Sequence, residues 1–153
     1  MKKKIILEAL NANNWLKICD LSVSDEQKAF FPISNLYWIG ISRYEEKTEL
    51  FAIKTDDEYI GLIGGGFDED GVTGYINPLM IDHHYQRNGY GKQAVQLIIK
   101  YLKDNLNVNK INLGHRKENI NAGYLYGSLG FKIIKDLGNQ WYKQLDLTKE
   151  QNE

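Results

Sequence analysis

The feature that most constrains the fold is the segment Ile81–Lys92. It follows an apolar stretch with strand character, contains Gly89 and Gly91, and leads into a long amphipathic helix. Glycines let backbone N–H groups turn toward one point without obstruction by a Cβ atom. The helix N-terminus adds unpaired N–H groups and the positive end of its dipole. A strand, loop and helix in this order therefore predict a site for a phosphate or pyrophosphate group.

The helix after this loop is the clearest element of the chain. Apolar residues recur along it at the spacing of one helical face, and polar residues occupy the other face. The apolar positions are Ala94, Leu97, Ile98, Tyr101 and Leu102. We expect this face to pack on a sheet.

The remaining pattern predicts a mixed α/β (α+β) fold with one sheet. Predicted strands are Lys4–Leu10, Leu50–Lys54, Glu58–Gly64, Gly74–Asp82, Lys110–Gly114, Phe131–Leu137 and Gln140–Leu147. Predicted helices run from Asn13 or Asn14 to about Val23, over Ile33–Glu46, and from a cap at Asn119 to a left-handed Gly130. Gly64–Gly66 predicts a bulge or a close backbone approach. The length of 153 residues suits a single domain, 1–153.

Composition narrows the class of protein. The net charge of −1 provides no global basic field of the kind that nucleic-acid binders use. No run approaches the ~20 apolar residues of a membrane span. Ile5–Leu7 is too short for a signal peptide, and the single Cys19 fits a reducing compartment. We therefore expect a cytoplasmic protein without nucleic-acid or membrane partners.

Several phosphate ligands are compatible with the loop at this point. A nucleoside-triphosphate loop would need glycine at Gln86 and a hydroxyl residue at Gln93. A dinucleotide loop would have a third glycine where Ala94 stands, and it would open the chain instead of lying past its middle. A nucleotide-binding domain stays open on this evidence, as does a loop that only turns a strand into a helix.

Two motifs resemble the GNAT superfamily of acyl-CoA-dependent N-acetyltransferases. The loop Gln86–Gly91 is similar to the family pattern Gln/Arg-x-x-Gly-x-Gly/Ala, which holds the CoA pyrophosphate. The segment Asn119–Phe131 resembles the pattern Asn-x-x-Ala-x-x-Leu-Tyr-x-x-x-Gly-Phe, which flanks the acetyl-CoA thioester. The segments Leu21–Lys28 and Leu79–Asp82 also resemble the spermine/spermidine acetyltransferase branch.

The resemblance implies both a fold and a co-substrate. It implies a single GNAT-like domain with a central, mostly antiparallel mixed sheet, splayed middle strands and flanking helices. It also implies acetyl-CoA as co-substrate, with no metal. By family position, the cofactor-binding residues are Leu79, Met80, Ile81, Gln86, Arg87, Asn88, Gly89, Tyr90, Gly91, Lys92, Asn119 and Tyr126.

Tyr126 occupies the family's position for the general acid that protonates the departing thiolate. Without the resemblance, Tyr126 would be a packing residue on an apolar helical stripe. The general base stays unassigned, with Asp82, His115 and Glu26 as candidates. We expect His83 and His84 not to form a metal pair, because adjacent residues on a strand point to opposite faces.

The acceptor is the least constrained part of the prediction. The resemblance places Glu26, Phe30 and Tyr37 at the acceptor site, and acidic groups there would attract a polycation. A polyamine is therefore the first candidate for a small-molecule amine acceptor. A peptide or protein N-acetyltransferase, and a CoA-binding regulatory module without activity, stay open. Exposed aromatic residues in the last strands would suit a homodimer.

Overall fold

The computed structural model describes residues 3–45 and 48–149. Its strands form a seven-stranded sheet in the order β1-β2-β3-β4-β5-β7-β6. Their bounds are β1 Ile6–Ala9, β2 Thr48–Lys54, β3 Tyr59–Phe67, β4 Gly74–Ile81, β5 Lys110–Arg116, β6 Lys132–Asp136 and β7 Gln140–Asp146. The helices are α1 Trp15–Cys19, α2 Asn35–Tyr44, α3 Tyr90–Leu106 and α4 Ile120–Ser128, with 3₁₀ turns η1 Asp25–Gln27 and η2 His83–Tyr85.

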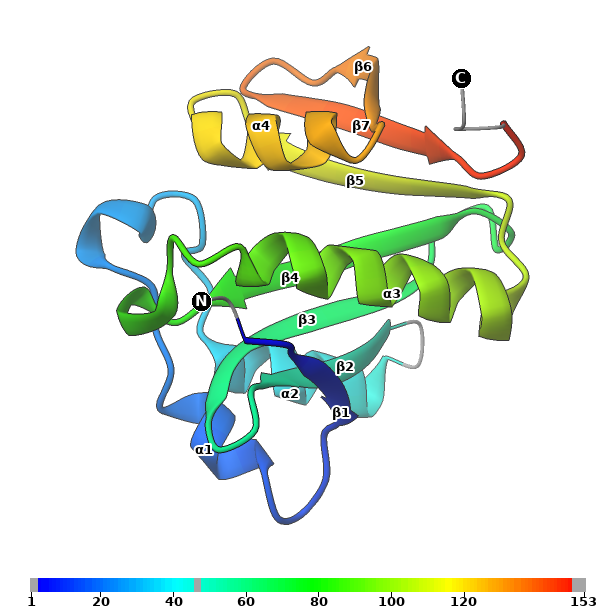
Figure 1. Ribbon diagram of the computed structural model, residues 1–153. Coiled ribbons are helices and arrows are strands. Elements are labelled where there is room, and N and C mark those ends of the chain that lie inside the picture. The colour runs from blue at the N-terminus through cyan, green and yellow to red at the C-terminus, as the bar shows by residue number, and fades with distance from the viewer. Residues whose placement is uncertain (1–2, 46–47, 150–153) are drawn as a thin grey trace.

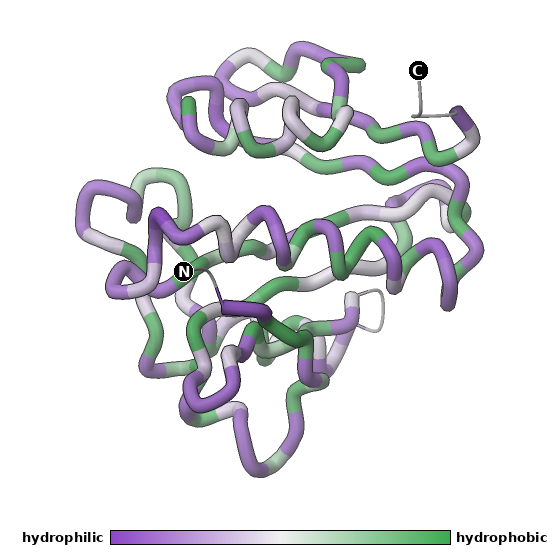
Figure 2. Tube along the Cα trace, viewed as in Figure 1, coloured by the Kyte–Doolittle hydropathy of each residue, from purple (hydrophilic) through white to green (hydrophobic). Residues whose placement is uncertain are grey.

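The helices cover both faces of the sheet (Figure 1). The apolar face of α3 is fully buried at Ala94, Val95 and Ile98, in a cluster that also includes Tyr126 of α4. The opposite face of the sheet is covered by α1 and α2, where Ile18 lies in a second cluster. Hydrophilic and hydrophobic colours alternate along α3 in Figure 2, as expected for a helix with one buried face.

The middle strands separate, as the resemblance implied. All neighbouring strands pair antiparallel except β4 and β5, which pair parallel only at Gly74↔Ile111 and Tyr75↔Asn112. Beyond that point β4 continues to Ile81 and β5 to Arg116 without further pairing between them. The predicted mostly antiparallel mixed sheet with splayed middle strands is confirmed.

The glycine run in β3 also behaves as predicted. The register between β3 and β4 shifts between Ile63 and Gly65. A Cβ atom added to Gly64 would lie 2.7 Å from the Asn77 carbonyl oxygen, so the backbones approach too closely for a side chain there. The bulge bends β4 just before the residues predicted to line the cofactor gap.

The first helix is shorter than predicted. It ends at Cys19 instead of continuing to about Val23. Two tertiary hydrogen bonds account for the difference. The Asn35 side chain donates to the Ile18 carbonyl at 2.8 Å, and the Ser22 backbone N–H donates to Asp82 Oδ2 at 3.0 Å. Both bonds take backbone groups that a longer helix would use for itself.

The second helix also differs at its ends. It runs over Asn35–Tyr44, and the side chain of Ser34 caps it by accepting from the Tyr37 N–H. The predicted end at Glu46 lies outside the described residues. Within 3–45 and 48–149, no helix has both the length and the apolar character needed to span a bilayer.

Candidate active site

The predicted cofactor loop has a backbone that few residues can adopt. Arg87 has φ 67° and Gly89 has φ 77°, both in the left-handed region. Gly89 is the N-cap of α3, and no side chain caps the helix there. The first helical bond runs from the Gln93 N–H to the Gly89 carbonyl, so the N–H groups of the first turn face out of the helix end. This arrangement can bind a phosphate group through backbone donors.

Two of the predicted cofactor residues hold the loop in place. Gln86 and Gln27 exchange reciprocal amide hydrogen bonds of 2.8 Å, and Gln86 Nε2 also donates to the Ile81 carbonyl at 2.8 Å. Asn88 Nδ2 donates to the carbonyls of Tyr85 and Gln86. Sequence reasoning missed Gln27, which lies on η1 far from the loop in the chain. These side chains fix the shape of the loop.

The loop carries two cations without acidic partners. Arg87 and Lys92 are both exposed. Neither forms an ion pair with any carboxylate among the described residues. Their charges are therefore available for an anionic group at the N-terminus of α3.

Gly91 lies where the loop side of α3 meets α4 and β4. An added Cβ atom would lie 3.6 Å from Leu125 Cδ1 and 3.9 Å from Ile81 Cγ1, which are ordinary contacts. No neighbour in the protein therefore requires glycine at this helical position, where glycine costs about 1 kcal/mol relative to alanine. A close approach of the pyrophosphate to the backbone at Gly91 stays a prediction.

The end of β4 forms one wall of the gap. Leu79, Met80 and Ile81 pair with β3 at Ile63, Leu62 and Gly61, and they have no partner on the side of β5. The unpaired edge of β4 could hold an extended chain such as pantetheine by backbone hydrogen bonds. The Ile81 carbonyl is already bonded to Gln86, which leaves fewer free groups at that residue.

Tyr126 of α4 lies beside β5, one of the two separated strands. Its side chain is buried, and its ring lies 5.8 Å from the ring of His115 on β5 and 5.7 Å from that of Phe131. Burial, with a smaller effect from Tyr75 on β4, raises the pKa of the Tyr126 phenol far above its ordinary value. No hydrogen-bond partner for its hydroxyl lies among residues 3–45 and 48–149. Tyr126 is therefore protonated at neutral pH, and its role as general acid stays a prediction.

Asn119 is the predicted cap of α4, and the structure confirms that role. Its side chain accepts a hydrogen bond from the Ala122 N–H at 3.2 Å. Gly130 follows the helix with φ 96°, the predicted left-handed end. A contact between Asn119 and the cofactor stays a prediction.

A polar network at the closed end of the gap was missed by sequence reasoning. Asp68 Oδ2 accepts from Asn112 Nδ2 at 2.8 Å and from the Tyr142 hydroxyl. Burial raises the pKa of Asp68, but these hydrogen bonds outweigh it and hold the pKa below its ordinary value. The resulting carboxylate raises the pKa of Tyr75, which burial raises more. The sequence signal was Asn112, a polar residue between the apolar residues Ile111 and Leu113.

The predicted acceptor residues lie on separate elements. Glu26 is exposed on η1, Phe30 is half-buried just after it, and Tyr37 is 58% exposed in the first turn of α2. None of them lines either of the two pockets described below. Their role stays a prediction.

The reason for excluding His83 and His84 as a metal pair is wrong. These residues lie in the η2 turn instead of on a strand, and their rings are 3.9 Å apart. With Asp82 they form a group whose possible ligand atoms lie within 4.8 Å of one another. Both Nδ1 atoms are occupied, His83 with the Ser22 carbonyl and His84 with Asp82 Oδ1. The absence of a metal stays a prediction.

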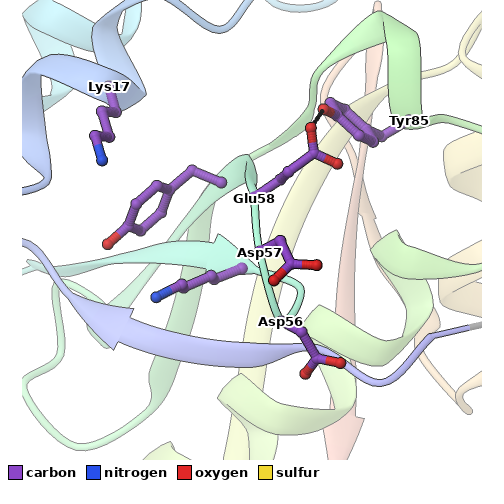
Figure 3. A pocket seen from close by; sticks show the side chains of 7 residues that line it. Lys17, Asp56, Asp57, Glu58 and Tyr85 are labelled. Atoms are coloured by element: carbon purple, nitrogen blue, oxygen red, sulfur yellow. Dashed lines mark hydrogen bonds between the residues drawn. The ribbon is translucent and has the colours of Figure 1, made fainter.

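A pocket of about 510 Å³ lies apart from the gap, beside the β2–β3 turn (Figure 3). Three acidic residues, Asp56, Asp57 and Glu58, line it together with Lys17. Tyr85 donates to Glu58 Oε2 at 2.7 Å, the bond drawn in the figure. This pocket contains none of the residues predicted for the cofactor or the acceptor.

Comparison with known proteins agrees with this geometry. The model of the acetyltransferase (GNAT) family matches residues 13–131. A probable spermine N(1)-acetyltransferase of Bacillus subtilis subsp. natto (strain BEST195) is 26% identical over 148 residues, covering 87% of this chain and 91% of that protein. The spermine/spermidine N(1)-acetyltransferase of Bacillus subtilis (strain 168) has the same identity and coverage.

Solved structures share the fold. Spermidine N-acetyltransferase from Vibrio cholerae, in complex with CoA and spermine, superposes with a TM-score of 0.77 at 18% identity, covering 95% of this chain and 97% of that one. Campylobacter jejuni N-acetyltransferase PseH, in complex with acetyl coenzyme A, gives 0.70 at 21% identity, covering 93% and 98%. The chain therefore belongs to the GNAT family and is an acyl-CoA-dependent N-acetyltransferase.

Proposed function

We propose that this enzyme transfers an acetyl group from acetyl-CoA to a primary amine of a small acceptor, with a polyamine as the first candidate and Tyr126 as general acid. The observation that carries the proposal is the position of Tyr126. It is buried beside His115 of β5, one of the two strands whose separation opens the gap. Its hydroxyl has no partner among the described residues.

The cofactor would lie with its pyrophosphate at the loop Gln86–Gly91 and its thioester in the gap. Bound there, it supplies an activated acetyl group. The unpaired N–H groups of the first turn of α3 and the free charges of Arg87 and Lys92 would hold the phosphates. The edge of β4 at Met80 and Ile81 would align the extended arm.

The reaction needs one proton to reach sulfur. The amine nitrogen attacks the thioester carbonyl carbon, the C–S bond breaks, and the departing thiolate takes a proton. Tyr126 is protonated at neutral pH like any phenol, and burial raises its pKa further. Since a thiol has a pKa of about 8.5, Tyr126 would first stabilise the developing thiolate by a hydrogen bond, and the proton would pass as the bond breaks. The proton lost by the amine restores the phenol through solvent.

The acceptor proposal rests on the relatives and on charge. Both curated relatives are named for spermine acetylation. In this chain, the ionised Asp68 lies at the closed end of the gap, bound to Asn112 and Tyr142. A carboxylate there favours a cationic acceptor. Glu26, Phe30 and Tyr37 would contact the distal part of such a molecule.

The test is a thiol-release assay with acetyl-CoA and a panel of amines: spermidine, spermine, a monoamine, an amino acid and a short peptide. We expect turnover with a polyamine. In Tyr126→Phe, kcat should fall by ~10²–10⁴-fold, the usual contribution of general acid catalysis, with little change in KM for acetyl-CoA. Tyr124→Phe is the matched control, because this exposed tyrosine of the same helix should change neither value.

Two results would contradict the proposal. If Tyr126→Phe keeps kcat within twofold of the wild type, Tyr126 is a packing residue. If only the peptide is acetylated, the small-molecule acceptor is wrong and the enzyme acts on polypeptides.

A further inference from the structure

Two segments that lie far apart in the chain are hydrogen-bonded to each other on both sides of η2. Residues 22–31, here called the η1 segment, form one of them. The Ser22 backbone N–H donates to Asp82 Oδ2, before η2, at 3.0 Å. After η2, the side-chain amides of Gln27 and Gln86 donate to each other at 2.8 Å. The η1 segment is therefore attached to the start of the cofactor loop.

The reciprocal Gln27–Gln86 pair, here called the amide clasp, joins the backbones of the two segments. Gln27 Oε1 also accepts from the Ser24 N–H at 3.3 Å. Gln86 Nε2 also donates to the Ile81 carbonyl at 2.8 Å. Each amide is thus bonded to its own segment as well as to the other one. A shift of one segment at the clasp is therefore transmitted to the other.

The amide clasp lies between residues that are predicted for the two substrates. On the acceptor side, Glu26 precedes Gln27, and the Phe30 N–H donates to the Gln27 carbonyl at 2.9 Å. On the cofactor side, Gln86 precedes Arg87, which has the left-handed φ of 67°. The position of Gln27 therefore sets where Glu26 and Phe30 lie relative to the cofactor loop.

The turn η1 has little stability of its own. It is a single 3₁₀ turn, Asp25–Gln27, and its three residues are half-buried or exposed. Short 3₁₀ turns have poor hydrogen-bond geometry, and regions with few buried contacts open at a low cost in free energy. The order of η1 therefore depends on its bonds to the cofactor loop.

We infer that Gln27 is a positioning residue through which acetyl-CoA, bound at the loop, fixes the η1 segment. The inference rests on the loop Gln86–Gly91 as the cofactor site, which is proposed above. A ligand that holds the loop backbone restrains Gln86, and the amide clasp then restrains Gln27 and the residues bonded to it. The same linkage acts in reverse, so loss of the clasp weakens the binding of acetyl-CoA.

Calorimetry and hydrogen exchange with acetyl-CoA test the inference without any acceptor. The proteins are wild type, Gln27→Met, Gln86→Met, the double variant and Lys28→Met. Methionine keeps the length of the glutamine side chain and removes its amide. Lys28→Met is the matched control, because Lys28 is exposed next to Gln27 and pairs with the exposed Asp25.

In wild type and Lys28→Met, we expect acetyl-CoA to slow hydrogen exchange at least threefold in the peptide that covers residues 25–31. In Gln27→Met this protection should be lost, and the Kd for acetyl-CoA should rise about fivefold, the effect of one net hydrogen bond. The double variant should bind acetyl-CoA no more weakly than Gln86→Met, because both substitutions break the same clasp.

Three results would overturn the inference. The first is a Gln27→Met variant with the Kd and the protection of wild type. The second is wild type that binds acetyl-CoA without protection of residues 25–31. The third is a double variant whose loss of affinity is the sum of the single losses, because Gln27 would then not act through Gln86. Unchanged binding of acetyl-CoA to Gly91→Val would instead overturn the loop as the cofactor site, and the inference with it.

Discussion

The two helices beside the gap begin in different ways. α3 begins at a left-handed Gly89 with no side-chain cap, whereas α4 begins at Asn119, whose side chain accepts from the Ala122 N–H. The protein thus satisfies a backbone donor of α4 itself and leaves those of α3 open. At such a helix end, an anionic ligand can accept hydrogen bonds from the unpaired N–H groups of α3 and pair with the charges of Arg87 and Lys92.

The two helices also have different proposed roles, cofactor binding for α3 and proton transfer for α4. α3 offers backbone groups at its N-terminus, while α4 offers one side chain, Tyr126, about two turns into the helix. Changes at the start of α3 should therefore alter the KM for acetyl-CoA. Changes at the start of α4 should alter stability, and only the loss of Tyr126 should alter kcat strongly.

The largest expected effect at the helix ends is that of Gly91→Val. The added methyl groups would occupy the space beside Leu125 and Ile81 that the pyrophosphate needs. We expect the KM for acetyl-CoA to rise at least tenfold, equivalent to about 1.4 kcal/mol of binding. Gly40→Val on α2 is the matched control, because a Cβ atom there meets nothing within 4 Å. Equal KM values in the two variants would mean that the cofactor does not approach Gly91.

Gly89→Ala should have a somewhat smaller effect on cofactor binding. A left-handed alanine costs roughly 1–2 kcal/mol, which the loop can relieve by turning its N–H groups away from the ligand. Gly138→Ala carries the same strain in the β6–β7 turn, where φ is 90°. Thermal unfolding should show similar losses of stability in both variants. A raised KM for acetyl-CoA is expected only for Gly89→Ala, and its absence would argue against backbone binding at α3.

The smallest expected effect on the kinetics is that of Asn119→Ala. Losing the cap should cost about 1 kcal/mol of unfolding free energy, and losing the predicted contact with the cofactor should raise the KM for acetyl-CoA only about threefold. Ser34→Ala removes the equivalent cap of α2 and provides the comparison by urea denaturation. An unchanged KM for acetyl-CoA in Asn119→Ala would mean that Asn119 only caps α4 and does not contact the cofactor.

Local patterns predicted the elements around the gap well. The spacing of Ala94, Ile98 and Leu102 marked α3, and the structure buries all three. Asn119 and Gly130 marked the two ends of α4. These predictions succeeded because periodicity, caps and left-handed glycines act within a few residues of the chain.

Predictions failed where distant segments compete for the same backbone groups. The first helix stops early because Asn35 and Asp82 bond to the chain around it. His83 and His84 stack because η2, capped by Asp82, replaces the expected continuation of the strand. Gln27 was not predicted, because it lies 59 residues from Gln86, whose amide it holds. A contact between Gln86 and the cofactor stays a prediction.

The sequence by itself determined the family, the order of the elements and the glycine loop, because each of these depends on motifs and spacings within a few residues of the chain. Only the tertiary structure decided where β4 and β5 separate, since pairing between strands depends on the bulge in β4 opposite Gly64 and on register across the sheet. The tertiary structure also places Asp68 next to Asn112 and Tyr142, and it places Lys143 and His115 together in a pocket beside α4. Burial and long-range contacts set the charge states of these groups, and neither can be read from neighbours along the chain.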